Sequence, residues 1–150
     1  MDLTDVTREL DSCDYLFLNA IEERGPDGLR LVVDVGKESP EATEIAIAGT
    51  IISGLHHVSA GESSLQYEID FATYIAYAVR NESYVLRDEE QVWAGKSFRV
   101  YSRSKFLDFV RSATFATTEY PGPFAHYSLV CQDRVVDVAS IAQPKVKRLR

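Results

Sequence analysis

Residues 65–79, LQYEIDFATYIAYAV, place an apolar side chain at every odd position except Thr73. A strand puts such a set on one face, because successive side chains point to opposite sides, whereas a helix would scatter it. At 15 residues the segment is longer than the usual strand of about 3–10 residues. It therefore predicts a strand that bends, carries a bulge or crosses from one sheet to another. The side chains expected to be mostly buried are Tyr67, Ile69, Phe71, Ile75 and Tyr77.

Further strands are predicted on both sides of this segment. Two of them flank the turn sequence GPDG at 25–28, and two others form a hairpin around residues 132–134. The predicted strands are 15–21, 29–35, 44–52, 84–86, 97–101, 124–131 and 135–141, and residues 36–41 are expected to form a loop.

Helical patterns are fewer. The clearest helix is expected to begin at Ser102 or Ser104 and to end near Thr114, with an apolar face formed by Phe106, Leu107, Phe109, Val110 and Ala113. Residues 2–14 carry Leu3, Val6 and Leu10 at helical spacing. We therefore predict one α+β domain over residues 1–150, with a mostly antiparallel, strongly curved sheet, sandwich or barrel-like, and one or two helices.

The charge balance excludes some partners. The 150-residue chain has a net charge of −7, although the last six residues, 145–150, carry four basic side chains and no acid. Such an acidic body repels nucleic acid and favours basic protein partners. For the basic tail three interpretations remain open: a frayed end, packing on the acidic body, or a contact with RNA or membrane. Without a signal sequence or an apolar run of about 20 residues, we expect a cytoplasmic protein that does not bind membranes.

Metal and cofactor signatures are missing. The adjacent His56 and His57 point to opposite sides of a strand and cannot share an ion. Cys13 and Cys131 lack the CxxC spacing of zinc or redox sites, and Cys131 and His126 would face opposite sides of one strand. We therefore expect no metal and no cofactor.

Two sets of candidate site residues follow. Acidic and aromatic side chains expected at the surface form a partner-binding set: Glu68, Asp70, Asp88, Glu89, Glu90, Tyr120 and Phe124. The alternative is a pocket in the curved sheet with Arg80, His126 and Tyr127 as its polar groups. Asp137 is expected to be exposed, or buried beside Arg134.

The sequence contains no P-loop, GxGxxG, GxSxG or HExxH motif, which lowers the expectation of an enzyme. The leading hypothesis is a small acidic binding module of bacterial type, in its sharpest form an immunity protein that neutralises a basic toxin. The alternatives are a small-molecule-binding protein or enzyme that uses the pocket, and a structural subunit of a homo-oligomer.

Overall fold

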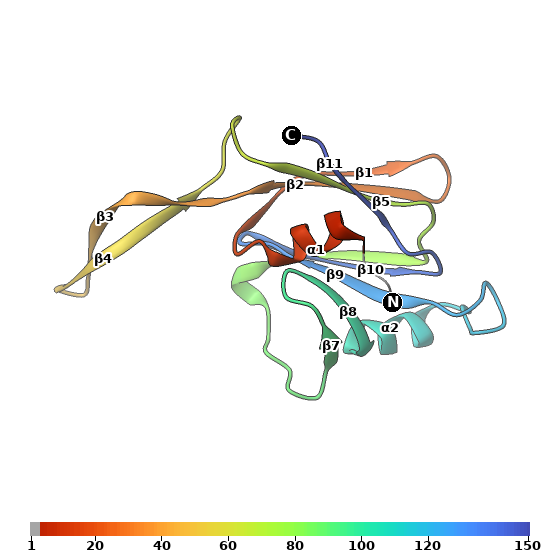
Figure 1. The fold of residues 1–150 in the computed structure, drawn as a ribbon. Coiled ribbons are helices and arrows are strands. Elements are labelled where there is room, and N and C mark those ends of the chain that lie inside the picture. The colour runs from red at the N-terminus through yellow and green to blue at the C-terminus, as the bar shows by residue number, and fades with distance from the viewer. Residues whose placement is uncertain (1–3) are drawn as a thin grey trace.

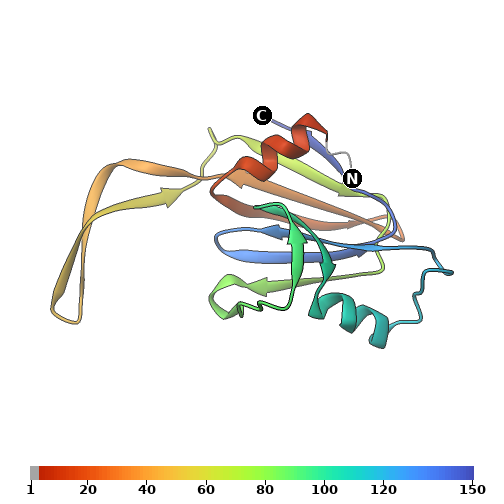
Figure 2. The same ribbon diagram turned by 60° about the horizontal axis from the view of Figure 1, so that its bottom comes forward.

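Two antiparallel sheets face each other across the core, and a two-stranded arm projects from them (Figures 1 and 2). The structure is a computed structural model that describes residues 4–150. The four-stranded sheet has the order β1 (Leu16–Arg24), β2 (Gly28–Val35), β5 (Gln66–Phe71) and β11 (Lys145–Arg148). The five-stranded sheet has the order β6 (Ala76–Asn81), β10 (Arg134–Ser140), β9 (Ala125–Val130), β8 (Phe98–Arg103) and β7 (Val92–Ala94). The predicted α+β class with mostly antiparallel sheets is confirmed, but neither sheet is closed or strongly curled, so the strong curvature is unconfirmed.

The long alternating segment supplies one strand to each sheet. β5 lies in the four-stranded sheet, and after a crossing at residues 72–75 the chain continues as β6 in the five-stranded sheet. Of the three expected outcomes, a bend, a bulge or a crossing between sheets, the structure shows the crossing, and the segment forms two strands instead of one long strand. Tyr67, Ile69 and Phe71 are buried, whereas Ile75 and Tyr77 are only half-buried because they lie at and beyond the crossing.

The core fills the space between the two sheets. It is built from alternate residues of β1, β2 and β5 on one side and of β8, β9 and β10 on the other, including Leu31, Ile69, Leu129 and Val136. Helix α1 (Asp5–Ser12) packs against β11 and β8 and adds Leu10 to this core, so it joins the two sheets. Leu3, which was expected on this helix, lies outside the described residues.

The second helix covers the outer face of the five-stranded sheet. Helix α2 (Lys105–Ala113) is capped by Ser104 and ends before Thr114, as predicted, and it packs on β9 and β10. Leu107 and Val110 are buried, but Phe109 is 55% exposed, so its assignment to the apolar face was wrong. Between β6 and β7 lies the 3₁₀ helix η1 (Glu82–Tyr84), where a short strand at 84–86 was expected. Within residues 4–150, neither helix is long and apolar enough to cross a membrane.

The arm corrects two further predictions. β3 (Lys37–Ile47) and β4 (Thr50–Ser59) pair with each other, and residues 37–59 are called the arm below. The single strand predicted at 44–52 is in fact a hairpin tip that turns at Ala48 and Gly49, both with positive φ. Two consecutive residues of positive φ are typical of a type I′ hairpin turn. Most of the loop expected at 36–41 belongs to β3.

The basic tail forms a strand. In β11, Lys145 pairs with Asp70, and Lys147 pairs with Glu68, across the β11–β5 ladder. Because opposite charges directly across a ladder attract, this pairing places the tail on its own acidic body. Of the open interpretations of residues 145–150, the structure supports packing on the acidic body and not a frayed end.

Candidate functional site

The outer face of the five-stranded sheet carries polar side chains that do not belong to the core. Successive side chains of a strand point to opposite faces, so these polar residues alternate with the core residues along each strand. Residues paired across neighbouring strands then form rows on the outer face. One row joins Tyr101 of β8 to His126 of β9, and the next joins Arg99, Ser128 and Asp137. Arg80, at the far end of β6, lies diagonally next to Asp137. Helix α2 and residues 82–91, called the 82–91 segment below, lie over this face (Figure 2).

A buried hydrogen-bond network links three of these elements to the start of α2. Asp137 accepts from His126 Nε2 on one oxygen (2.7 Å) and from Arg80 Nε and Nη2 on the other (3.2 and 3.0 Å). His126 Nδ1 lies 2.7 Å from Ser104 Oγ, and this oxygen also accepts from the backbone N–H of Leu107 (3.0 Å). His126 is held between the rings of Tyr101 and Phe106, at centroid distances of 4.4 and 4.8 Å.

One tautomer of neutral His126 matches every partner in the network. An ionised carboxylate only accepts hydrogen bonds, so His126 Nε2 carries a proton and donates it to Asp137. With the proton on Nε2, Nδ1 of the neutral ring is an acceptor, so the Ser104 hydroxyl, which accepts from Leu107 N–H, donates its own proton to Nδ1. A neutral imidazole therefore satisfies every donor and acceptor between Leu107 and Asp137.

Asp137 stays ionised although it is buried. Burial alone would raise the pKa of its carboxyl, but the hydrogen bond from His126 and the charge of Arg80 outweigh burial and hold the pKa below its ordinary value. A buried charge of this kind needs its partners, because removing one of them leaves the other uncompensated.

Ser104, His126 and Asp137 have the residue types of a nucleophilic triad, but the geometry does not allow that chemistry. Ser104 is 3% exposed and its hydroxyl caps α2, so a substrate carbonyl has no route to Oγ. A nucleophile must reach its substrate as well as its base. The network instead fixes the position of Arg80, whose side chain remains 48% exposed.

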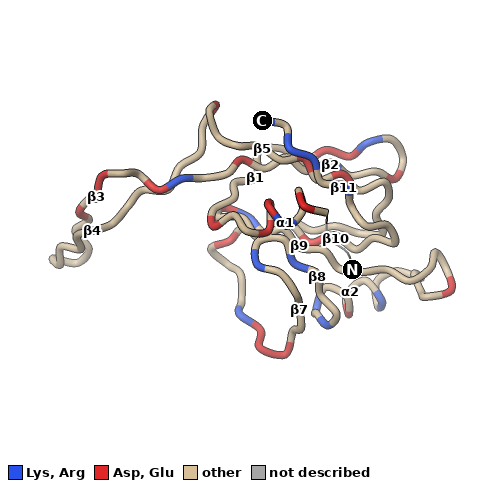
Figure 3. The backbone as a smooth tube through the Cα atoms, viewed as in Figure 1, with Lys and Arg blue, Asp and Glu red and all other residues tan. Residues whose placement is uncertain are grey.

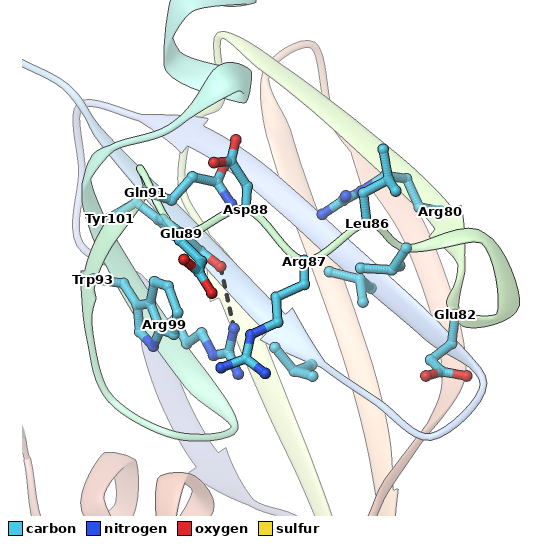
Figure 4. A pocket seen from close by; sticks show the side chains of 13 residues that line it. Arg80, Glu82, Leu86, Arg87, Asp88, Glu89, Gln91, Trp93, Arg99 and Tyr101 are labelled. Atoms are coloured by element: carbon cyan, nitrogen blue, oxygen red, sulfur yellow. Dashed lines mark hydrogen bonds between the residues drawn. The ribbon is translucent and has the colours of Figure 1, made fainter.

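A cavity lies between this network and the 82–91 segment (Figure 4). It has two lobes that share Arg80, Leu86, Asp88, Gln91 and Tyr101. The lobe over His126 and Asp137 has a volume of about 390 Å³ and is bounded by α2. The lobe toward Trp93 and Arg99 has a volume of about 630 Å³. Both volumes lie in the range of roughly 300–1,000 Å³ that is usual for small-molecule sites.

The charges around the cavity fall into paired and unpaired groups. Asp88 pairs with Lys105 at 3.4 Å and accepts from Glu90 N–H, interactions that lower the pKa of its carboxyl. Arg99 stacks over the Trp93 ring at 4.6 Å and donates to the hydroxyl of Tyr101 at 3.3 Å. Figure 4 shows Arg87 extending from the 82–91 segment toward the end of the cavity where Arg99 lies.

The arm is a second candidate site. Its tip, residues 45–55, contains no charged residue, whereas Lys37, Glu38, Glu41 and Glu44 precede it (Figure 3). Five large apolar side chains of the tip are between 36% and 67% exposed: Ile45, Ile47, Ile51, Ile52 and Leu55.

The apolar side chains lie on both faces of the tip. Ile45 is directly opposite Ile52, while Ile51 is opposite Ala46 and so points to the other face. A hairpin of this kind has no core of its own, and an isolated two-stranded ribbon is only marginally stable in water.

The predicted partner-binding residues fall in three separate places. Glu68 and Asp70 lie on the outer face of the four-stranded sheet, where Glu68 is bound to Arg30 at 2.7 Å. Asp88, Glu89 and Glu90 belong to the 82–91 segment, and Asp88 faces the cavity. Tyr120 and Phe124 lie beyond the other end of α2, where Tyr120 is exposed and stacks on Phe115. The structure therefore does not combine these residues into one surface.

The alternative pocket set is partly brought together. Arg80 and His126 line the cavity, but Tyr127 points into the core and packs on Phe71 and Phe98. Neighbouring residues of a strand face opposite sides, so the alternation of β9 already separates His126 from Tyr127. Asp137 is buried, as one alternative held, but its partners are Arg80 and His126 and not Arg134.

Several residues of the site were not among the predicted sets. Ser104 was identified only as a helix cap, and Arg87, Gln91, Trp93 and Arg99 were not considered as a group. In residues 4–150 no group of three or more His, Cys, Asp and Glu side chains is placed to hold a metal ion. No protein-family model, curated protein or solved structure matches the chain.

Proposed function

We propose that this protein is a binding module whose arm inserts into an apolar groove on a basic partner protein, as an immunity protein would engage a basic toxin. The observation that carries the proposal is the exposed, uncharged tip with isoleucines on both of its faces. Ile45, Ile47 and Ile52 share one face of the tip and Ile51 is the large apolar side chain of the other face, so the ribbon can contact both walls of a groove, which suits insertion better than a flat contact.

The charge pattern supports a basic partner. Glu38, Glu41 and Glu44 lie between the body and the tip, and Lys37 is the only lysine or arginine of the arm. The chain as a whole carries −7. A groove with a basic rim would meet these glutamates when the tip enters it, and opposite charges speed and orient such encounters. A second copy of this acidic chain would instead bring like charges together, which disfavours a homo-oligomer through this contact. The cytoplasmic location expected from the sequence remains part of the proposal.

The proposal is tested by cross-linking from the tip in living cells. A photo-reactive amino acid at Ile51 is expected to give an adduct with one basic protein, whereas the same amino acid at the exposed Tyr84 is not. Adducts of the chain with itself would overturn the proposal in favour of a homo-oligomer.

Purified partner then allows a quantitative test. Because Glu38 and Val58 are cross-strand partners, residues 39–57 can be replaced by an Asn-Gly turn that keeps the hydrogen bond from Tyr15 of the body to Glu38. This variant is expected to lose binding. Glu41→Lys with Glu44→Lys is expected to slow association at 0.1 M salt and much less at 1 M, because the Debye length falls from roughly 10 Å to about 3 Å. Glu119→Lys, on an exposed loop outside the arm, is the matched control. Unchanged affinity after removal of the arm would refute the proposal.

A further inference from the structure

The cavity under the 82–91 segment is separate from the arm, and both polar and apolar side chains line it. Its two lobes, of about 390 and 630 Å³, are lined by side chains from β6, β7, β8, β9, β10, the start of α2 and the 82–91 segment (Figure 4). Apolar side chains, among them Leu86, Val130 and Val135, form part of the wall. The cavity therefore offers apolar contact as well as polar groups.

Arg80 is held ready to bind an anion. Its Nε and Nη2 atoms are bound to the buried Asp137, and Asp137 is held in turn by His126. A guanidinium has five N–H donors in a fixed plane, so the Nη1 donors stay available on the cavity side. A side chain fixed in this way loses little freedom when a ligand arrives.

Arg87 and Arg99 supply a second cationic group. Both line the larger lobe, and their guanidinium ends approach the same, Trp93 end of the cavity in Figure 4. Among residues 4–150, neither has a carboxylate oxygen within 4.0 Å, although Glu82 and Glu89 line the same lobe. The chain has a net charge of −7, yet two guanidinium groups without a bound carboxylate lie at one end of this cavity. Their positive charge favours the binding of an anion there.

We propose that this cavity binds a small organic oxyanion, a phosphate monoester or a carboxylate that carries an apolar body. The oxyanion is bound by Arg87 and Arg99 in the larger lobe, with Arg80 as the fixed donor between the two lobes. The apolar body packs against Leu86, Val130 and Val135. Guanidinium groups suit this role because their paired N–H donors match the two oxygens of a carboxylate or phosphate.

The experiment is a titration of the ¹⁵N-labelled protein with phenyl phosphate, followed by NMR. Benzoate presents a carboxylate on the same ring, phenol has the ring without the oxyanion, and inorganic phosphate has the oxyanion without the ring. We expect saturable shifts at residues 80, 87 and 99 with phenyl phosphate or benzoate, and the tighter of the two identifies the oxyanion. Phenol and inorganic phosphate are expected to bind at least about tenfold more weakly.

Two variants and one control assign the binding to the cavity. Arg87→Gln, in the 82–91 segment, and Arg99→Gln are each expected to weaken binding about tenfold, as loss of a hydrogen bond to a charged group does. Arg111→Gln removes the same charge from the far end of α2 and is expected to leave binding unchanged. The proposal is overturned if no probe saturates, if phenol binds as well as phenyl phosphate, or if all three variants bind alike.

Discussion

Replacing Ser104 by alanine tests whether the buried network contributes to stability beyond its role as a helix cap. The Ser104 hydroxyl accepts from Leu107 N–H and donates to His126 Nδ1. Loss of an N-cap hydroxyl costs about 1 kcal/mol. A buried Nδ1 without a donor costs roughly 1–3 kcal/mol more. We therefore expect the free energy of unfolding to fall by about 2–4 kcal/mol.

Thr4 provides a matched control. It caps α1 as Ser104 caps α2, but its hydroxyl bonds only within its own helix, to the backbone and hydroxyl of Thr7. Thr4→Ala is expected to cost about 1–2 kcal/mol, because it removes the cap and also the hydrogen bond to the buried Thr7 hydroxyl. Ser104→Thr keeps both the acceptor and the donor and is expected to stay close to the wild type.

The assay is equilibrium unfolding in urea followed by circular dichroism. With a slope of roughly 2 kcal/mol per molar urea, Ser104→Ala lowers the midpoint by about 1–2 M and Thr4→Ala by about 0.5–1 M. If Ser104→Ala costs no more than Thr4→Ala, then the bond to His126 adds nothing and the network does not hold Arg80 in place as argued.

Three further predictions concern single side chains. The pKa of Asp137 is lower in the folded protein than in the unfolded chain, so its carboxylate stabilises the fold fully above the unfolded pKa of about 3.9, and this stabilisation is lost as the pH falls through the folded pKa. Below about pH 4 the wild type should therefore lose more unfolding free energy than Asp137→Asn does. Urea titrations at several pH values would measure this difference. Burial raises the pKa of both thiols, that of Cys131 to about 12, but only Cys131 is fully buried. Iodoacetamide at about pH 8 should therefore modify Cys13 and leave Cys131 untouched until urea is added, as peptide mass spectrometry would show. Leu107→Ala should cost about 2–5 kcal/mol and Phe109→Ala less than about 1 kcal/mol in the same unfolding assay, because only Leu107 is buried; equal losses would contradict this packing.

Elements whose signal lies within a few neighbouring residues were predicted well. The alternation of residues 65–79 predicted extended structure with a bend, a bulge or a crossing between sheets, and the structure shows the crossing; of the two candidate caps, Ser102 and Ser104, it is Ser104 that caps α2. The arm was missed because Ala48 adopts positive φ, which is uncommon for alanine. Without a typical Asn-Gly or Gly-Gly turn signal, the isoleucines of two strands were interpreted as one strand.

The candidate site depends on contacts that local patterns do not encode. Arg80 and Asp137 are 57 residues apart, and they meet because β6 pairs with β10 and not with a strand next to it in sequence. Once that pairing is known, their places follow from alternation alone. The Arg87 and Arg99 pair likewise depends on how the 82–91 segment passes over β8, for which the sequence carries no repeating pattern.

The way the arm is attached has a mechanical consequence. β3 continues β2 with only Gly36 between them, and β2 is hydrogen-bonded on both sides, to β1 and to β5. A pull along the arm would therefore load two ladders in shear, so that many hydrogen bonds must break together rather than one after another. Such an anchor resists traction far better than a loop at a sheet edge would, and anything that grips the tip pulls on the centre of the domain.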